Sequence, residues 1–263
     1  MKIVYIGDIY GALGLEALDR FLPTLKRDHP HHILIMNGEN SADGLGIRLK
    51  EYKHMMQAGA HAIVLGNHAF SKQELFEFIE NAKIVRPLNY PKGTPGTGCQ
   101  IIRHNQHTVA ILQVMGRVFM HDPLDNPFDA LDEALKTLQA DVRIVDIHAE
   151  TTSEKLALAH HLDGRVDAVF GTHTHVQTND AMRLPKGTFY LTDVGMTGAK
   201  FGILGADRQT VINKFRSGMP LRLFPESERM LQLNAVLVDL DAQTIQTLHY
   251  SDSQRKDAYG QRL

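Results

Sequence analysis

The stretch of sequence that says most about the fold is Val166-Asp167-Ala168-Val169-Phe170-Gly171-Thr172-His173-Thr174-His175. A short, mainly apolar run ends at a glycine, and two histidines follow it. Such a run is typical of a strand that is covered on both faces, so we predict a strand over residues 166–170. Because residues two apart in an extended segment point to the same side, we expect His173 and His175 to face one site.

Similar runs recur along the chain, and each ends in Gly, Asn, Asp or His. They predict strands over residues 3–6, 33–36, 62–65, 109–114, 142–147, 189–191 and 233–240. Helical patterns lie between the early runs, whereas the end of the chain is rich in strands. This mixture predicts an α/β fold in which two packed sheets have helices outside them. The glycine-rich stretches 91–98 and 195–205 are short enough to be loops, so we expect residues 1–263 to form a single domain.

Local patterns predict where several elements begin and turn. Ser71-Lys72-Gln73-Glu74 and Thr151-Thr152-Ser153-Glu154 read as capping boxes at the starts of helices. Asn126-Pro127 supplies an N-cap and a proline at the first helical position. Asp207 is predicted to cap a helix that ends near Ser217-Gly218. The stretch Leu240-Asp241-Ala242-Gln243 predicts a hairpin turn between strands at 233–239 and 244–250.

The composition is that of a globular chain with balanced charge. The 263 residues include 28 Lys and Arg and 30 Asp and Glu, for a formal charge of −2. This balance argues against a dedicated duplex-DNA binder, which needs clustered positive charge, but it allows a nucleotide-sized ligand. With 43% hydrophobic and 22% charged residues, the sequence is not that of a disordered chain.

The sequence carries no mark of export or membrane insertion. The one cysteine, Cys99, cannot form an intrachain disulfide, which fits a reducing compartment. No apolar stretch approaches the roughly 18 residues of a membrane span, and the run at residues 3–6 is too short for a signal peptide. We therefore expect a cytoplasmic protein without a membrane partner. A small homo-oligomer is the common default for such a chain.

Polar residues follow five of the predicted strands. In chain order they are Asp8, then Glu39 and Asn40, then Asn67 and His68, then His148, and finally His173 and His175. Each alone has an ordinary explanation, such as a loop cap, a turn or a hydrogen-bonded histidine near the core. Because ligands of open α/β sheets collect outside the carboxyl ends of the strands, we expect the five sets to converge.

The side chains in these sets include an unusual number of metal-binding atoms. Two carboxylates, two amide oxygens and three imidazoles come from Asp8, Glu39, Asn40, Asn67, His148, His173 and His175. They are too many for one tetrahedral zinc ion, and they suit two ions that share a bridging ligand. A set of oxygen and nitrogen donors without thiolate favours iron, manganese or zinc. Two carboxylates and one hydroxide leave about one positive charge on two divalent ions, which suits an anionic phosphate ester.

The order of these motifs resembles the calcineurin-like metallophosphoesterase superfamily, whose pattern is Asp-x-His, Gly-Asp, Gly-Asn-His-(Asp/Glu), His and Gly-His-x-His. Tyr10 stands where the first histidine of the pattern belongs, and Glu39-Asn40 stands where an aspartate would bridge. Both departures are similar to the YmdB-like branch. Further segments that resemble this branch are Gly38-Glu39-Asn40, Asn89-Tyr90-Pro91, His148-Ala149-Glu150 and Asp193-Val194-Gly195-Met196-Thr197-Gly198. The similarity runs from Met1 to about Leu240.

The resemblance implies a four-layer α/β/β/α metallophosphoesterase sandwich with two metal ions per chain. The ions implied are iron or manganese, with zinc as an alternative. By position in the motifs, one ion would be held by Asp8, Asn40 and His175, the other by Asn67, His148 and His173, and Glu39 would bridge both. His68 resembles the family's proton donor, although Ala69 follows it where the superfamily usually has an acidic residue.

The resemblance also implies the activity of a cyclic-nucleotide phosphodiesterase. We expect hydrolysis of 2′,3′-cyclic nucleotides, with 3′,5′-cyclic nucleotides as poorer substrates, by attack of a metal-bridging hydroxide on phosphorus while His68 protonates the leaving oxygen. Other small phosphodiesters and RNA ends with a cyclic phosphate fit the same site. Two alternatives stay open: a phosphomonoesterase such as a nucleotidase, and a regulatory scaffold with a structural metal site.

Overall fold

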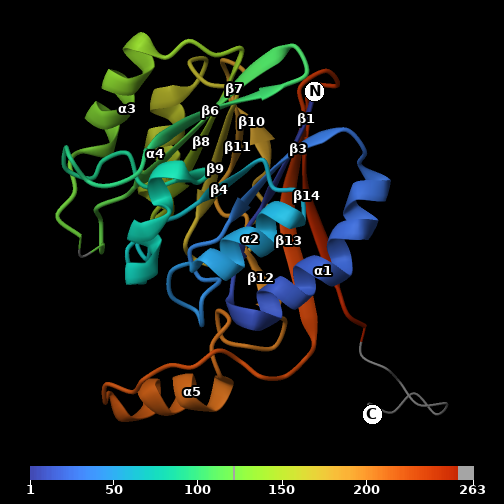
Figure 1. The fold of residues 1–263 in the computed structure, drawn as a ribbon, viewed down its shortest axis with the longest axis vertical. Coiled ribbons are helices and arrows are strands. Elements are labelled where there is room, and N and C mark those ends of the chain that lie inside the picture. Colours follow the sequence, from blue (N-terminus) through green and yellow to red (C-terminus); the bar gives the residue numbers. More distant parts are fainter. Residues whose placement is uncertain (121, 254–263) are drawn as a thin grey trace.

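The computed structural model of the chain describes residues 1–120 and 122–253 and contains two packed β-sheets (Figure 1). The first sheet has eight strands in the order β2-β12-β13-β1-β3-β4-β5, with β14 paired to β13. Its strands are β1 (Lys2–Ile6), β2 (Asp8–Ile9), β3 (His32–Asn37), β4 (Ala62–Val64), β5 (Ile84–Val85), β12 (Met196–Ala199), β13 (Leu231–Asp239) and β14 (Thr244–Ser251).

The second sheet has six strands in the order β10-β11-β9-β8-β7-β6. These strands are β6 (Cys99–His104), β7 (His107–Met115), β8 (Val142–His148), β9 (Ala168–Thr172), β10 (Met182–Arg183) and β11 (Phe189–Leu191). The core strands β7, β8 and β9 run parallel to one another.

Helices cover the outer face of each sheet. On the first sheet lie α1 (Gly11–Asp28) and α2 (Leu49–Gln57), and on the second lie α3 (Pro127–Thr137) and α4 (Thr152–Leu162). A fifth helix, α5 (Arg208–Ser217), lies at the bottom of the molecule in Figure 1, apart from these layers. None of the helices in the described part of the chain combines the length and the apolar character that crossing a lipid bilayer requires.

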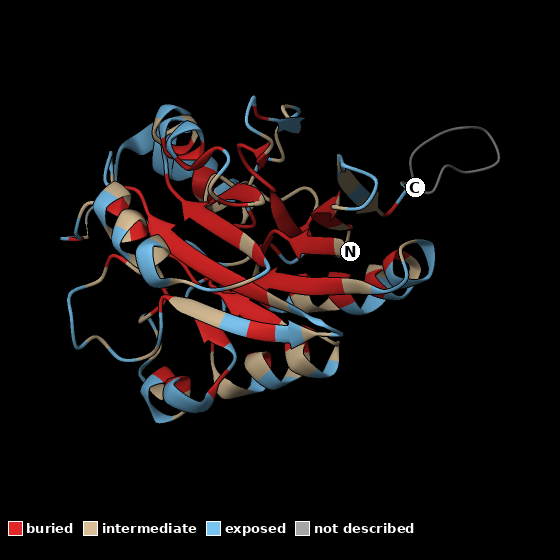
Figure 2. Cartoon of the chain, turned by 90° about the horizontal axis from the view of Figure 1, so that it is seen from above, coloured by how far each residue is buried: buried red, intermediate tan, exposed pale blue. Residues whose placement is uncertain are grey.

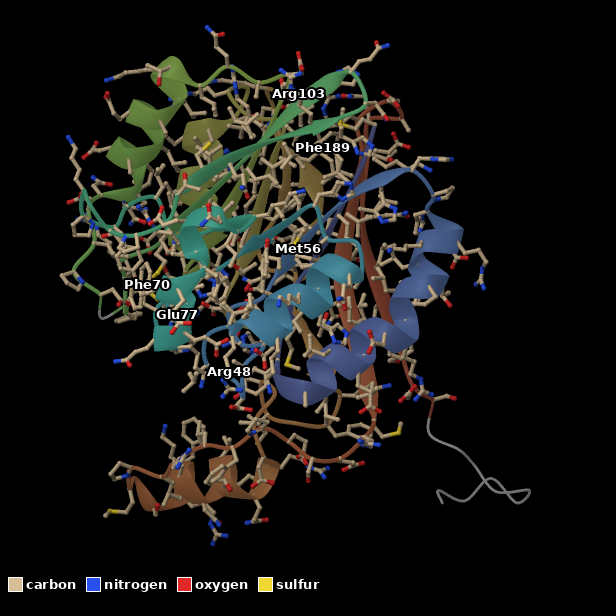
Figure 3. All side chains as sticks on the ribbon, viewed as in Figure 1. Arg48, Met56, Phe70, Glu77, Arg103 and Phe189 are labelled. Carbon is tan, nitrogen blue, oxygen red and sulfur yellow. The ribbon has the colours of Figure 1, made fainter. Side chains whose placement is uncertain are left out.

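The side chains of β1 show why both faces of the strands are covered. Ile3 and Tyr5 point into the core between the sheets, whereas Val4 and Ile6 point into the core under the helices. Phe189 of β11 belongs to the same core between the sheets (Figure 3). Successive side chains of a strand alternate between its faces, so a continuously apolar strand fits between two cores. The central strands are accordingly buried along most of their length (Figure 2). The predicted four-layer α/β/β/α sandwich is confirmed.

The predicted strands are all present, with shifted ends. The prediction for residues 189–191 coincides with β11. The strand predicted over 166–170 instead begins at Ala168, because Val166 forms an isolated bridge with Asp163 in the preceding turn. The predicted hairpin is confirmed, since β13 and β14 pair in antiparallel register from Asp239 and Thr244 onward.

Two of the predicted N-caps are confirmed. The Asn126 side chain accepts a hydrogen bond from the backbone N–H of Phe128 at 3.0 Å and begins α3. The Asp207 side chain accepts one from the backbone N–H of Thr210 at 2.8 Å and begins α5. Both side chains satisfy backbone donors that a helix start otherwise leaves unpaired.

The two predicted capping boxes are wrong, because Glu74 and Glu154 accept hydrogen bonds from backbone groups other than those at the predicted helix starts. Residues 71–81 form only the short 3₁₀ helices η1 (Gln73–Glu77) and η2 (Ile79–Asn81), and Glu74 accepts a hydrogen bond from the backbone of Leu49 at the start of α2. Thr151 does precede α4, but its side chain makes no cap bond. Glu154 accepts from the backbone N–H of Arg117 at 2.9 Å instead. Partners distant in the sequence thus replace the local ones in both boxes.

The topology brings the ends of both sheets to one edge of the molecule. In the first sheet β1, β3 and β4 run parallel, and in the second β8 and β9 do. Hydrogen bonds join the segments that follow these strands across the two sheets, such as the one from the backbone of His173 to Asp8. The predicted convergence of the five strand ends is therefore present in the fold.

The caps differ in their expected contribution to stability. We predict that Asn126→Ala lowers the free energy of unfolding by about 1 kcal/mol, because it removes the acceptor at the start of α3. Ser71→Ala should change it by less than about 0.5 kcal/mol, since this exposed serine caps no helix. Urea denaturation of both variants checks the pair, and equal losses would contradict the assignment.

Candidate metal centre

A cavity of about 590 Å³ lies where the carboxyl ends of the two sheets meet. Five of the predicted site residues line it, namely Glu39, Asn40, His68, His173 and His175. The other three, Asp8, Asn67 and His148, contact these lining residues directly. All the predicted site residues thus lie together at this edge of the fold.

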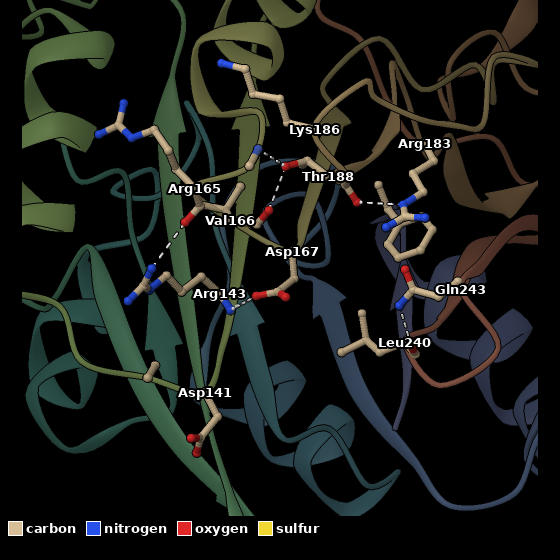
Figure 4. Close-up of a pocket in the computed structure, with 14 residues that line it drawn as sticks. Asp141, Arg143, Arg165, Val166, Asp167, Arg183, Lys186, Thr188, Leu240 and Gln243 are labelled. Carbon is tan, nitrogen blue, oxygen red and sulfur yellow. Dashed lines mark hydrogen bonds between the residues drawn. The ribbon is translucent and has the colours of Figure 1, made fainter.

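A second cavity, of about 350 Å³, lies at the opposite end of the six-stranded sheet, where β8, β9 and β11 begin (Figure 4). Its cationic side chains include Arg143, Arg183 and Lys186. The backbone N–H of Arg143 donates to the carboxylate of Asp167 at 2.7 Å in its wall. Among the described residues that line this cavity, none is a histidine. Among the described residues, the group of three metal-binding side chains with ligand atoms within 4.8 Å of one another is Glu39, His148 and His173, at the first cavity.

The centre of the first cavity's donor set is the ring of His148. Its Nε2 lies 3.0 Å from Oε1 of Glu39, 2.8 Å from Oδ1 of Asn67 and 3.0 Å from Nδ1 of His173. Ligand atoms of Glu39, His148 and His173 all lie within 4.8 Å of one another. One imidazole N–H can satisfy only one of three such neighbours. Several lone pairs crowded around one buried point suit a bound cation.

The second nitrogens of two histidine rings are held by side chains behind the centre. Nδ1 of His148 donates to Oγ1 of Thr172 at 2.8 Å, and this hydroxyl donates to Asp146 at 2.9 Å. Nε2 of His173 lies 3.1 Å from the carboxylate of Glu150. With a proton on each outer nitrogen, the inner nitrogen would present its lone pair to a cation at the centre, as metal-binding histidines require.

Asn40 and His175 form a second pair of donors beside Asp8. Oδ1 of Asn40 lies 3.2 Å from Nε2 of His175, and the amide group of Asn40 donates to the backbone of Gly44. Nδ1 of His175 donates to the carbonyl of Leu204 at 2.9 Å, so its Nε2 is the inner nitrogen. Oδ1 of Asp8 is fully buried and has no hydrogen-bond partner among the described residues. A buried carboxylate oxygen without a partner fits the place of a metal ligand.

Tyr10, which replaces a histidine of the superfamily pattern, packs beside the centre. Its ring meets the ring of His175 edge-on, with 5.7 Å between the centroids. Gly44 makes room for it, because a Cβ at this glycine would come within 2.7 Å of the tyrosine hydroxyl. Asn40, rather than Tyr10, presents an oxygen to His175. The geometry therefore supports Asn40 as the donor that occupies the missing histidine's place.

The backbone that carries His173 and His175 differs from the extended segment that we predicted. Strand β9 ends at Thr172, and the two histidines have φ angles of +96° and +64°. Both lie in the left-handed region that non-glycine residues seldom adopt. Their rings still reach the same centre, but a turn brings them there, not the alternation of a strand.

A buried ion pair holds this strained turn. Nζ of Lys155 donates to Oδ2 of Asp193 at 2.8 Å, and both side chains are fully buried. The same carboxylate oxygen accepts from the backbone and hydroxyl of Thr174, between the two histidines. Neither residue was predicted to have a role, although Asp193 follows β11 much as the other polar residues follow their strands.

The charges of the centre show that it stabilises positive charge. Burial acts to raise the pKa of Glu39, but the neighbouring His148 lowers it to about 2. Burial acts to lower the pKa of His148, but the Glu39 carboxylate raises it to about 9. For Asp8, burial raises the pKa to about 6. The carboxylates of this buried site therefore favour a cationic partner.

His68 lies in the cavity wall next to these donors. Its backbone N–H donates to Oε2 of Glu39 at 3.2 Å, and the side-chain amide of Asn67 donates to its Nε2 at 3.3 Å. Burial lowers the pKa of its ring. The residue after it, Ala69, is buried in the core and makes no polar contact with the ring. Asn67 thus orients His68, where the superfamily pattern has an acidic residue.

Comparison with known proteins places the chain among close relatives. It matches the family described as YmdB-like protein over residues 4–252. It is 46% identical over 247 residues, 93% of either chain, to the 2′,3′-cyclic-nucleotide 2′-phosphodiesterase of Bacillus subtilis (strain 168). A hypothetical protein from Thermus thermophilus has a TM-score of 0.91 and 42% identity, with 96% of this chain and 100% of that one covered. A novel phosphatase from Mycoplasma pneumoniae has a TM-score of 0.88 and 34% identity, with 95% and 93% covered.

The buried ion pair generates a test of stability. We predict that Asp193→Asn lowers the free energy of unfolding by about 3 kcal/mol, because it leaves the Lys155 charge buried without its partner. Adding Lys155→Met should restore part of this loss. Lys136→Met, which breaks an exposed pair with Glu133, is the control and should leave stability nearly unchanged. Urea denaturation measures all three, and a neutral Asp193→Asn would contradict the role.

Proposed function

We propose that this chain, which belongs to the YmdB-like protein family, is a metal-dependent phosphodiesterase that hydrolyses 2′,3′-cyclic nucleotides. The observation that carries the proposal is the crowding of Glu39, Asn67 and His173 around Nε2 of His148. The Bacillus subtilis relative supplies the substrate class. It is named for the hydrolysis of the 2′ bond of a 2′,3′-cyclic nucleotide, a reaction that leaves the phosphate on the 3′ oxygen.

We propose two ions at this centre, iron or manganese, with zinc as the alternative. The donors would be Asp8, Asn40 and His175 for one ion and Asn67, His148 and His173 for the other, with Glu39 between them. The inner lone pairs of the three histidines and the unpartnered oxygen of Asp8 support this division. When bound, such ions acidify water into a nucleophile at neutral pH and offset the charge of the phosphate.

The proton for the leaving oxygen would come from His68. This residue lines the cavity beside the proposed donors, and Asn67 holds its Nε2. Its Nδ1 is then the nitrogen that can present a proton to the 2′ oxygen as the P–O bond breaks. Histidine suits this role because its ordinary pKa lies close to neutral pH, and the charge of Glu39 counters the burial that lowers the pKa of His68.

The proposed proton donor can be separated from the proposed metal ligands. We predict that His68→Ala lowers kcat for 2′,3′-cyclic AMP by about 10²–10⁴-fold, the usual value of general-acid help, and leaves the metal content unchanged. His160→Ala, at an exposed position on α4, is the control. Steady-state hydrolysis and elemental analysis of the same samples check both parts. Full activity in His68→Ala would remove the residue from the mechanism.

Variants of the proposed metal ligands, unlike His68→Ala, should lose bound metal as well as activity. Glu39→Gln should lower both the bound metal and the hydrolysis rate, the latter by at least about 100-fold, since it removes half of the carboxylate charge. Asn40→Ala should lower the metal content as well. Glu133→Gln, an exposed charge loss on α3, is the matched control. Full metal occupancy in Asn40→Ala would overturn its role as a ligand.

A failure to hydrolyse cyclic nucleotides would also be informative. If the metal-loaded protein leaves 2′,3′-cyclic AMP intact but hydrolyses nucleoside monophosphates, the phosphomonoesterase alternative replaces the proposal. If it hydrolyses neither, the alternative of a regulatory protein with a structural metal site gains support.

A further inference from the structure

One wall of the cavity at the metal centre is apolar and open. It is formed by Leu45, Leu204, Leu223 and Phe224, whose exposed fractions are 48%, 49%, 40% and 52%. Single exposed apolar side chains are ordinary on a protein surface. Four of them, from three separate segments of the chain, are gathered in one cavity beside polar donors. Such a combination is typical of a small-molecule site.

Main-chain hydrogen bonds fix this wall to the centre. The carbonyl of Leu204 accepts the Nδ1–H of His175 at 2.9 Å, and Leu204 itself has a φ angle of +52°. The carbonyl of Phe224 accepts the backbone N–H of Asp207 at 2.8 Å. These bonds hold the wall at a fixed position relative to His175, a proposed metal ligand.

Phe224 offers the one aromatic ring of the apolar wall. The guanidinium carbon of Arg222 lies 5.1 Å from the centre of the ring, a cation–π contact that helps to hold it. About half of the residue remains exposed toward the cavity and solvent. A cyclic nucleotide has a charged phosphate and a flat base, and the cavity has the proposed metal donors on one side and the apolar wall on the other.

We propose that Phe224, with the leucines of the apolar wall, forms a subsite that binds the nucleobase of the substrate by stacking. The inference rests on the proposed function for the location of the phosphate. The inference goes beyond the proposed function by stating that the protein binds the base and that Phe224 is the residue that contacts it. Stacking does not depend on a hydrogen-bond pattern, so the subsite should accept purines and pyrimidines.

The test compares ligands that differ in the base. The metal-loaded protein is titrated calorimetrically with adenosine 3′-phosphate and with glycerol 2-phosphate, which has no base. The wild type should bind the nucleotide about ten-fold more tightly, the scale of one base stacked on an aromatic ring. Phe224→Ala should abolish this preference, and Phe224→Tyr should keep it. Phe215→Ala is the matched control, because Phe215 is 82% exposed on α5 and does not line the cavity.

Hydrolysis of 2′,3′-cyclic AMP and of glycerol 1,2-cyclic phosphate by the same variants separates this inference from the proposed function. Phe224→Ala should raise KM about ten-fold for the first substrate and less than about two-fold for the second. A wild-type preference that survives in Phe224→Ala overturns the subsite, even if the protein hydrolyses both esters. A preference that Phe224→Ala removes supports the subsite, even if the wild type hydrolyses neither.

Discussion

The contact between Glu39 and His148 joins the two separate sheets of the fold. Glu39 follows β3 of the first sheet, and His148 ends β8 of the second. Their side chains meet at 3.0 Å in a place that solvent does not reach. Isolated there, either charge would be costly to bury. Pairing the two side chains offsets this cost, and so would a cation bound by the surrounding donors. Either form of stabilisation requires both sheets to be in place.

A second buried pair of charged side chains serves the same region. Lys155 and Asp193 are fully buried, and their pair holds the turn that carries His173 and His175. Replacing such a pair with apolar side chains is often neutral or favourable for stability, so stability alone does not explain it. Two histidines in the left-handed region need neighbours that hold them there. Asp193 of this ion pair accepts the hydrogen bond from the backbone N–H of Thr174, between the two histidines.

The sequence predicted the layers of the fold and the convergence of the strand ends better than it predicted the local geometry. Strands such as β1 and β11 are short and apolar on both faces, so the sequence alone is enough to predict them. The capping boxes failed because Glu74 and Glu154 found backbone donors far along the chain. The pair of Lys155 and Asp193 spans 38 positions, and no local pattern marks it. His173 and His175 line one cavity, but they lie in a turn and not in the extended segment that was predicted; the carboxylate of Asp193, distant in the sequence, accepts hydrogen bonds from Thr174 between them.

The way in which the apolar wall is attached bears on how related enzymes diverge. The bonds at Leu204 and Phe224 use their carbonyl oxygens, and a carbonyl is the same whatever side chain its residue carries. A substitution at Phe224 therefore leaves the anchoring of the wall in place, and one at Leu204 does so where the new residue tolerates the left-handed backbone. Descendants of one ancestral sequence could change which molecules they select through single replacements here, while the buried residues around His148 stayed constant. Selectivity and chemistry would then evolve at different rates within one architecture.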